Sequence, residues 1–112
     1  MKIYYSQVGG FAGIALSTEV DINSRPSEDR QRIQTMIDSA KFFSLPSQFP
    51  SPKEGADYLI HKITIETEKS KHTVETTDLT MPNGLWPLVK YLIKESKSKI
   101  LNSKLYRMIE YA

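Results

Sequence analysis

Gly9-Gly10-Phe11-Ala12-Gly13 is the stretch on which the predicted fold depends. It contains three of the five glycines in a chain of 112 residues, and glycine readily adopts the positive φ values that tight turns require. Apolar and polar residues alternate on both sides of it, over 2–8 and 14–22, with the period of a half-buried strand. The sequence therefore predicts an antiparallel hairpin whose two strands are joined by this glycine-rich loop.

The rest of the chain adds a helix, a second hairpin and another helix. A helix is predicted at about 27–40, where apolar residues recur every three or four positions and Ser27 is a suitable N-cap. Strands are predicted over 58–67 and 72–77 from their alternation. A second helix follows from about 85 to 97, with the same helical spacing of apolar residues.

The order of these elements predicts the fold class. The order is ββαββα, which favours an α+β protein with a four-stranded, mostly antiparallel sheet and helices packed on one face. A β-grasp-like topology is the closest common plan. We expect a single domain over 1–97. A short amphipathic helical tail is expected over 98–112, which docks on the domain or serves a second chain.

A segment rich in proline and serine follows the first predicted helix. Pro46, Pro50 and Pro52 favour a long extended loop, and its aromatic residues are too apolar for a free linker. One interpretation is a belt packed across the sheet. The other is a second binding surface centred on 47–50, which the prolines would order before binding.

Composition argues against several classes of function. Because the chain has no cysteine, disulfides, thiolate nucleophiles and cysteine-based zinc sites cannot form. The 15 lysines and arginines are scattered among 13 acidic residues, which argues against a nucleic-acid surface. No apolar run approaches the roughly 20 residues that span a bilayer, and no signal peptide is recognised. We expect a cytoplasmic protein whose partner is neither nucleic acid nor membrane.

The two histidines suggest little catalytic chemistry. No His-Glu-x-x-His spacing, phosphate loop or nucleophile elbow occurs in the sequence. His61 falls in the apolar row of its strand, a position typical of a satisfied, half-buried side chain. His72 either caps the preceding turn or pairs with His61 in a weak metal site, although two ligands rarely suffice. We therefore expect a protein that is not an enzyme and has no cofactor or metal of its own.

With the elements placed, the sequence resembles one family. Five elements occur in the order and spacing of the emfourin-type inhibitors, small bacterial proteins that inhibit protealysin and other thermolysin-like zinc metalloproteases. Gln7 stands where that family often has arginine, and the segment from Ser96 extends beyond the family's usual length. The resemblance covers about 2–95, and its five elements are Gly9–Ile14, Phe42–Pro46, Asp57–Ile65, His72–Asp78 and Pro82–Leu88.

The resemblance implies a competitive inhibitor of thermolysin-like metalloproteases. These enzymes prefer a bulky apolar residue just after the scissile bond, and Phe11 preceded by the small Gly10 has that form. In the alternative interpretation, Phe11 and Ala12 pack under the first helix. The alternative function is an interaction module with a different partner, or one that self-associates through the tail. The candidate protease-binding residues are Gly9, Gly10, Phe11, Ala12, Gly13 and Phe49.

Overall fold

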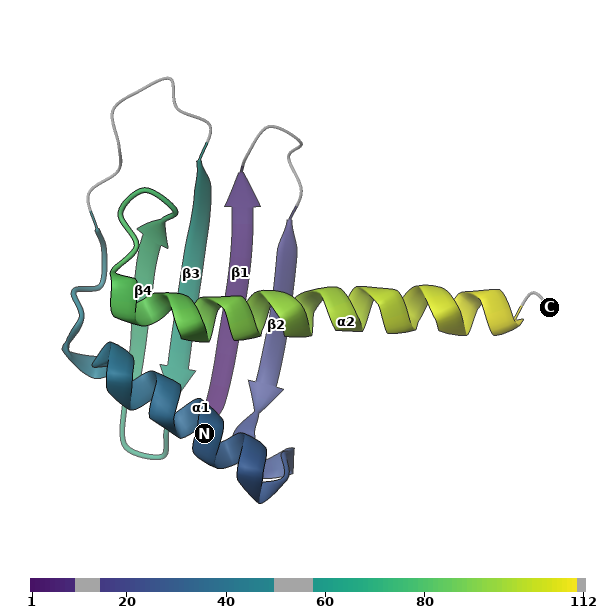
Figure 1. Ribbon diagram of the computed structural model, residues 1–112, viewed down its shortest axis with the longest axis horizontal. Helices are drawn as coiled ribbons and strands as arrows, with labels where there is room; N and C mark the ends of the chain where they lie inside the picture. The colour runs from purple at the N-terminus through teal and green to yellow at the C-terminus, as the bar shows by residue number, and fades with distance from the viewer. Residues whose placement is uncertain (10–14, 50–57, 111–112) are drawn as a thin grey trace.

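A single four-stranded sheet forms one layer of the molecule (Figure 1). The computed structural model describes residues 1–9, 15–49 and 58–110. The strands lie in the order β2-β1-β3-β4, and every neighbouring pair is antiparallel. The α+β class and the ββαββα order are thereby confirmed. The strands are β1 (Lys2–Gly9), β2 (Leu16–Asp21), β3 (Leu59–Glu66) and β4 (Lys71–Thr77).

The β-grasp-like topology is not found. In that plan the first strand lies beside a parallel neighbour, whereas β1 pairs antiparallel with both β2 and β3. The cause is the long connection after the first helix. It returns the chain to the end of the sheet where β1 finishes, so that Leu59, the first residue of β3, lies opposite Gly9, the last residue of β1.

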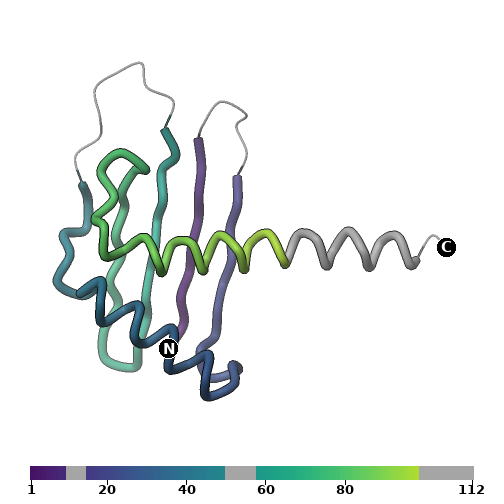
Figure 2. The backbone as a smooth tube through the Cα atoms, viewed as in Figure 1, coloured from purple at the N-terminus to yellow at the C-terminus, as the bar shows by residue number. Residues whose placement is uncertain are grey.

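Two helices cover one face of the sheet (Figure 2). The first, α1 (Ser27–Ala40), has the predicted bounds, but Ser27 is its first residue and not its cap. Pro26 occupies the N-cap position and makes no side-chain hydrogen bond to the helix. The first turn is instead stabilised by Glu28 and Asp29, because acidic side chains interact favourably with the positive end of the helix dipole.

The second helix, α2 (Trp86–Glu110), is 25 residues long. The tail therefore continues α2 and is not the separate third helix that was predicted. The physical reason is that no glycine or proline follows Pro87 within this stretch, so nothing in the sequence stops the helix. Three short 3-10 helices are also present in the described residues, at Ile22–Ser24 (η1), Phe42–Ser44 (η2) and Asn83–Leu85 (η3).

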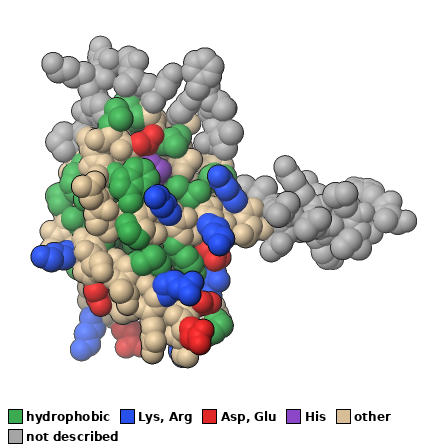
Figure 3. All heavy atoms as spheres, viewed as in Figure 1, with side chains coloured by type: hydrophobic (Ala, Val, Ile, Leu, Met, Phe, Trp, Pro, Cys, Tyr) green, Lys and Arg blue, Asp and Glu red, His purple; other side chains and the backbone are tan. Residues whose placement is uncertain are grey.

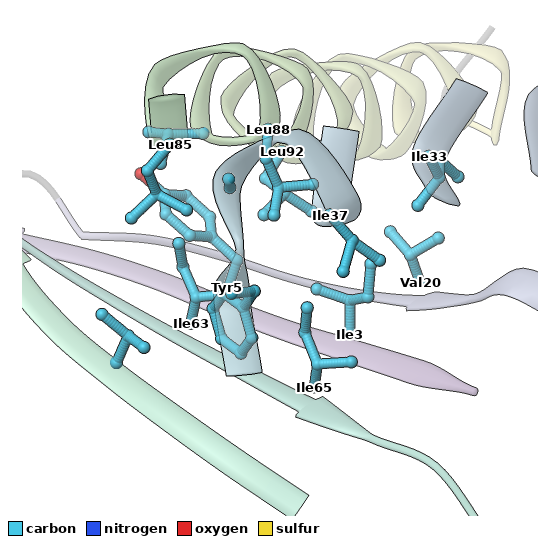
Figure 4. Close-up of a cluster of buried hydrophobic side chains, with 14 of the residues drawn as sticks. Ile3, Tyr5, Val20, Ile33, Ile37, Ile63, Ile65, Leu85, Leu88 and Leu92 are labelled. Atoms are coloured by element: carbon cyan, nitrogen blue, oxygen red, sulfur yellow. The ribbon is translucent and has the colours of Figure 1, made fainter. Parts of the chain in front are cut away.

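The hydrophobic core lies between the sheet and the two helices (Figure 4). Alternate residues of each strand face the helices, and apolar residues of α1 and α2 face the strands. Each fully buried aliphatic side chain contributes on the order of 1.5–3 kcal/mol through the hydrophobic effect. The central members are Ile3 and Tyr5 of β1, Val20 of β2, Ile63 and Ile65 of β3, Val74 of β4, Ile33 and Ile37 of α1, and Leu88 and Leu92 of α2.

Candidate functional site

The segment 10–14, which was predicted to bind a protease, follows β1 at the end of the sheet where β3 begins. Gly9 ends β1 and pairs with Leu59, which begins β3. The segment 10–14 therefore starts, and the segment 50–57 finishes, beside this pair; both segments lie outside the described residues. We call this region, formed by Gly9, Leu59 and the neighbouring Asp78, the Gly9 end of the sheet. The predicted contacts of Gly10, Phe11, Ala12 and Gly13 fall in the undescribed part and stay predictions.

Gly9 has a conformation and surroundings that require glycine. Its φ is +99°, in the region that side-chain-bearing residues rarely adopt. A Cβ atom at this position would lie 2.9 Å from the carbonyl oxygen of Tyr58. Gly9 therefore supplies the positive φ that the sequence predicted, and it also lets the start of β3 approach β1 closely.

Phe49 lies in a segment that covers the outer edge of β4. The backbone N–H of Glu75 donates to the carbonyl of Ser47 at 2.9 Å, and that of Phe49 donates to the carbonyl of Glu75 at 3.0 Å. This segment runs parallel to β4 at its edge, and not across the sheet as a belt would. The Phe49 side chain is half-buried and packs against the core, so its described contacts are structural.

A buried polar network joins β1 to β3 just beneath the Gly9 end. The Tyr5 hydroxyl lies 3.1 Å from Oε1 of Gln7 and 2.8 Å from Nδ1 of His61. Nε2 of His61 lies 3.2 Å from Oδ1 of Asp78. His61 is 1% exposed and Tyr5 2% exposed. The prediction that His61 lies in the buried row of its strand with its polar atoms satisfied is confirmed. We call these four residues the Tyr5 network.

The heavy-atom positions of the Tyr5 network suit either protonation state of His61. In the neutral form, Nε2–H donates to Asp78, Nδ1 accepts the Tyr5 hydroxyl proton, and the Gln7 amide turns its NH2 group towards Tyr5. In the charged form, both ring nitrogens donate, and the Tyr5 hydroxyl donates to Gln7 instead. Burial lowers the pKa of His61 and outweighs the opposing effect of the Asp78 hydrogen bond, so the neutral form is favoured at pH 7.

The contacts from Tyr5 through His61 to Asp78 have the order of a catalytic relay, but their burial prevents that use. Burial, with a smaller contribution from the Asp78 charge, raises the pKa of Tyr5 far above its usual value, so its hydroxyl keeps its proton. Trp86, the half-buried first residue of α2, lies edge-on to the His61 ring with centroids 6.1 Å apart. A substrate could not reach either ring, so the network stabilises the fold.

His72 does not pair with His61, and the metal site considered from the sequence is wrong. The register of the second hairpin places His61 opposite Thr76 and His72 opposite Ile65. The His72 Nε2–H donates to the carbonyl of Leu45 at 2.8 Å, so this side chain anchors the segment after η2. Within the described ranges, no group of three or more potential ligands could hold a metal ion.

Asp78 is the structurally important residue of this region that sequence reasoning missed. Its Oδ1 accepts the backbone N–H of Leu59 at 3.0 Å, and its own N–H donates to the Leu59 carbonyl at 3.2 Å. It thereby extends the pairing of β3 beyond the last residue of β4. No local signal could have revealed this, because the carboxylate binds a backbone 19 residues earlier in the chain.

Three large apolar side chains are notably exposed in the described part of the chain. Val8 is 45% exposed, Phe43 43% and Leu79 65%. Val8 precedes Gly9 and Leu79 follows Asp78, so two of the three belong to the Gly9 end. Phe43 lies in η2, with its ring centroid 6.4 Å from that of His72.

The helix-covered face has side chains of both charges (Figure 3). Lys90, Lys94 and Lys97 line a shallow groove along α2, while the Arg25 guanidinium lies 2.9 Å from the Glu95 carboxylate. The Glu95 hydrogen bond raises the pKa of Arg25 further. Neither α1 nor the described α2 is long and apolar enough to cross a membrane.

The fold defines a class: a small α+β protein with a four-stranded antiparallel sheet covered by two helices. Among the described residues, no buried side-chain nitrogen or oxygen lacks a hydrogen-bond partner. A protein-family model, Emfourin, matches residues 5–93, and the chain belongs to the Emfourin family. Membership implies a protease-inhibitor-type role. No curated protein and no solved structure matches the chain significantly.

Proposed function

We propose that this protein is a competitive inhibitor of a thermolysin-like zinc metalloprotease of the protealysin type, and that it binds the enzyme through the Gly9 end of the sheet. The observation that supports the proposal most is the family match over residues 5–93. Gly9, the first of the candidate binding residues, is fixed at this end by its pairing with Leu59, which adds a geometric reason for the proposal. The protein acts by binding alone, without catalysis and without a cofactor.

The proposed mechanism rests on how the segment 10–14 is anchored. Gly9 pairs with Leu59 on one side of it, and Leu16 pairs with Gln7 on the other. A segment with fixed ends loses less conformational entropy on binding than a free peptide does. In this mechanism Phe11 enters the apolar pocket that normally takes the residue after the scissile bond. The hairpin then holds the two flanking strands together and opposes release of cleaved ends.

The test is a titration of the protein against a panel of purified thermolysin-like proteases with a peptide substrate. For at least one enzyme we expect the apparent KM to rise with inhibitor concentration while kcat is unchanged. Phe11→Asp should raise the inhibition constant at least about 30-fold, the size expected for a hot-spot residue. Phe11→Ala should raise it less, and urea denaturation of each variant separates lost binding from lost folding.

Phe43 offers a matched control for Phe11. Phe43 is exposed and lies in η2, so Phe43→Ala should leave the inhibition constant within about twofold of the wild-type value. If the folded wild-type protein inhibits no enzyme of the panel at micromolar concentration, the proposed function is wrong. If a folded Phe11→Asp variant inhibits as well as the wild type, Phe11 is not a contact residue.

A second candidate function, self-association through the tail, is supported by the length of α2. The helix continues to Glu110, and Leu101, Leu105 and Met108 fall at helical spacing within it. We propose that this half of α2 pairs with a second copy of the chain. The test is to measure the oligomeric state of the full chain, and of a chain that ends at Ser98, by analytical ultracentrifugation. We expect the full chain to dimerise and the shortened chain to stay monomeric. A full chain that stays monomeric at 100 μM or so overturns this candidate.

A further inference from the structure

The turn between β4 and η3 presents an exposed leucine. Leu79 lies in the four-residue turn Thr77-Asp78-Leu79-Thr80 and is 65% exposed, more than Val8 or Phe43. An exposed leucine needs no explanation by itself. What distinguishes Leu79 is how firmly the backbone on both sides of it is held.

Two sets of hydrogen bonds hold the turn. Within it, the Thr80 N–H donates to the Thr77 carbonyl at 3.2 Å, and the two threonine hydroxyl oxygens lie 2.8 Å apart. Outside it, the Asp78 N–H donates to the Leu59 carbonyl at 3.2 Å, and the Asp78 carboxylate accepts the Leu59 N–H at 3.0 Å. The backbone on both sides of Leu79 is thus held in position before any partner binds, which lowers the entropic cost of binding.

The turn is also continuous with the Gly9 end of the sheet. Leu59, to which Asp78 bonds, pairs with Gly9, and Val8 pairs with Ile60 in the next row. Leu79 and Val8 therefore lie at the same end of the sheet. Phe43, the third exposed apolar residue, belongs to the other end, since it stacks near His72, whose strand partner Ile65 pairs with Ile3.

Interface size indicates that the segment 10–14 does not bind alone. A stable, specific interface uses about 20–30 residues from each partner, and this segment has five. Neighbouring parts of the same end must supply the remaining contacts. Among the described residues, the turn 77–80 is directly hydrogen-bonded to that end and offers an exposed apolar side chain.

We propose that the turn Thr77–Thr80 is a second contact element of the inhibitor, and that Leu79 is buried against an apolar surface of the partner metalloprotease beside its active-site cleft. This inference rests on the proposed function. Val8 contributes to the same apolar contact from the adjacent end of β1. Leucine and valine side chains suit an apolar surface and would not suit a charged one.

The test compares substitutions at Leu79 with the same substitutions at Phe43. On an enzyme that the wild type inhibits, Leu79→Asp should raise the inhibition constant at least about tenfold, whereas Phe43→Asp should leave it within about twofold. Leu79→Met, which keeps the apolar character of the side chain, should retain most of the wild-type affinity for the enzyme. Urea denaturation of each variant, with inhibition constants corrected for the folded fraction, removes effects on stability.

The outcomes separate this inference from the proposed function. If the wild type inhibits an enzyme and a folded Leu79→Asp variant inhibits it equally well, the inference is wrong and the proposed function stands. If the wild type inhibits no enzyme, both are wrong. If Leu79→Asp changes the sedimentation coefficient but not the inhibition constant, the leucine contacts a second copy of this chain, and the inference is again overturned.

Discussion

The Tyr5–His61 hydrogen bond allows a quantitative test of how β1 and β3 are held together. Tyr5→Phe removes one hydroxyl from a side chain that is 2% exposed, and His61→Phe keeps a ring of similar size while removing both nitrogens. In the wild-type protein, the Tyr5 hydroxyl oxygen lies 2.8 Å from Nδ1 of His61. If this bond stabilises the fold, the two substitutions together should cost less than the sum of their separate costs.

The expected magnitudes follow from what each substitution leaves behind. Tyr5→Phe leaves the buried Nδ1 of His61 without its partner, a penalty of about 1–3 kcal/mol. His61→Phe removes the bonds to Tyr5 and Asp78, but the Tyr5 hydroxyl keeps Gln7 and Asp78 keeps Leu59. At about 0.5–1.5 kcal/mol per lost bond, it should cost about 1–3 kcal/mol. The double variant removes the ring nitrogen that Tyr5→Phe alone leaves unpaired, so the coupling energy should be about 1 kcal/mol or more.

Urea denaturation at pH 7.5 measures the free energy of unfolding of the wild type, both single variants and the double variant. Tyr4→Phe is the matched control, because Tyr4 is the neighbouring residue of β1 and its side chain lies on the opposite face, half-buried. It should change the free energy of unfolding by no more than about 0.5 kcal/mol. A coupling energy below about 0.3 kcal/mol, or an equal loss from Tyr4→Phe, would refute the role given to the network.

Two further predictions concern the same end of the sheet. Gly9→Ala should lower the free energy of unfolding by about 1–3 kcal/mol, since the φ of +99° at Gly9 and the 2.9 Å approach of a Cβ to the Tyr58 carbonyl oxygen both disfavour a side chain. Urea denaturation measures this loss, and a loss under about 0.5 kcal/mol would contradict the prediction. Because burial lowers the pKa of His61 in the folded protein, the unfolded chain protonates His61 first as pH falls below about 6.5. The contribution of neutral His61 to the free energy of unfolding is therefore complete above that pH. Below it, the free energy of unfolding falls by up to about 1.4 kcal/mol per pH unit. Urea denaturation between pH 7.5 and 5.5 should show this pH dependence of the free energy of unfolding in the His72→Phe variant but not in the His61→Phe variant. An equal pH dependence in both variants would contradict the prediction.

The elements that repeat a local pattern could be predicted from the sequence. The bounds of α1 were predicted to the residue, because its apolar positions recur at helical spacing and Pro26 marks its start. Strand β2 was predicted one residue too long at its C-terminal end, since Ile22 continues the alternation but begins η1. Its predicted start at residue 14 lies outside the described residues. Alternation predicts which face a residue occupies, whereas chain direction and turns decide where a strand stops.

Features that depend on residues far apart in the sequence could not be predicted. The pairing of Gly9 with Leu59 joins two strands that are separated in the sequence by β2 and α1, and no local pattern specifies it. The same holds for Asp78, which looked like an ordinary loop residue and yet closes the start of β3. Whether Phe11 contacts a protease or the core stays a prediction, since the segment 10–14 lies outside the described residues.

The Tyr5 network also explains how the register at the Gly9 end is specified. In a strand, a slip of one residue moves every side chain to the opposite face. Such a slip of β1 would carry Tyr5 away from His61 and leave the buried Nδ1 of that ring without its partner. Apolar residues alone could tolerate a slip of two, but a hydroxyl 2.8 Å from Nδ1 could not. The network thereby fixes Gly9 opposite Leu59, at the end of the sheet where we propose that the protease binds.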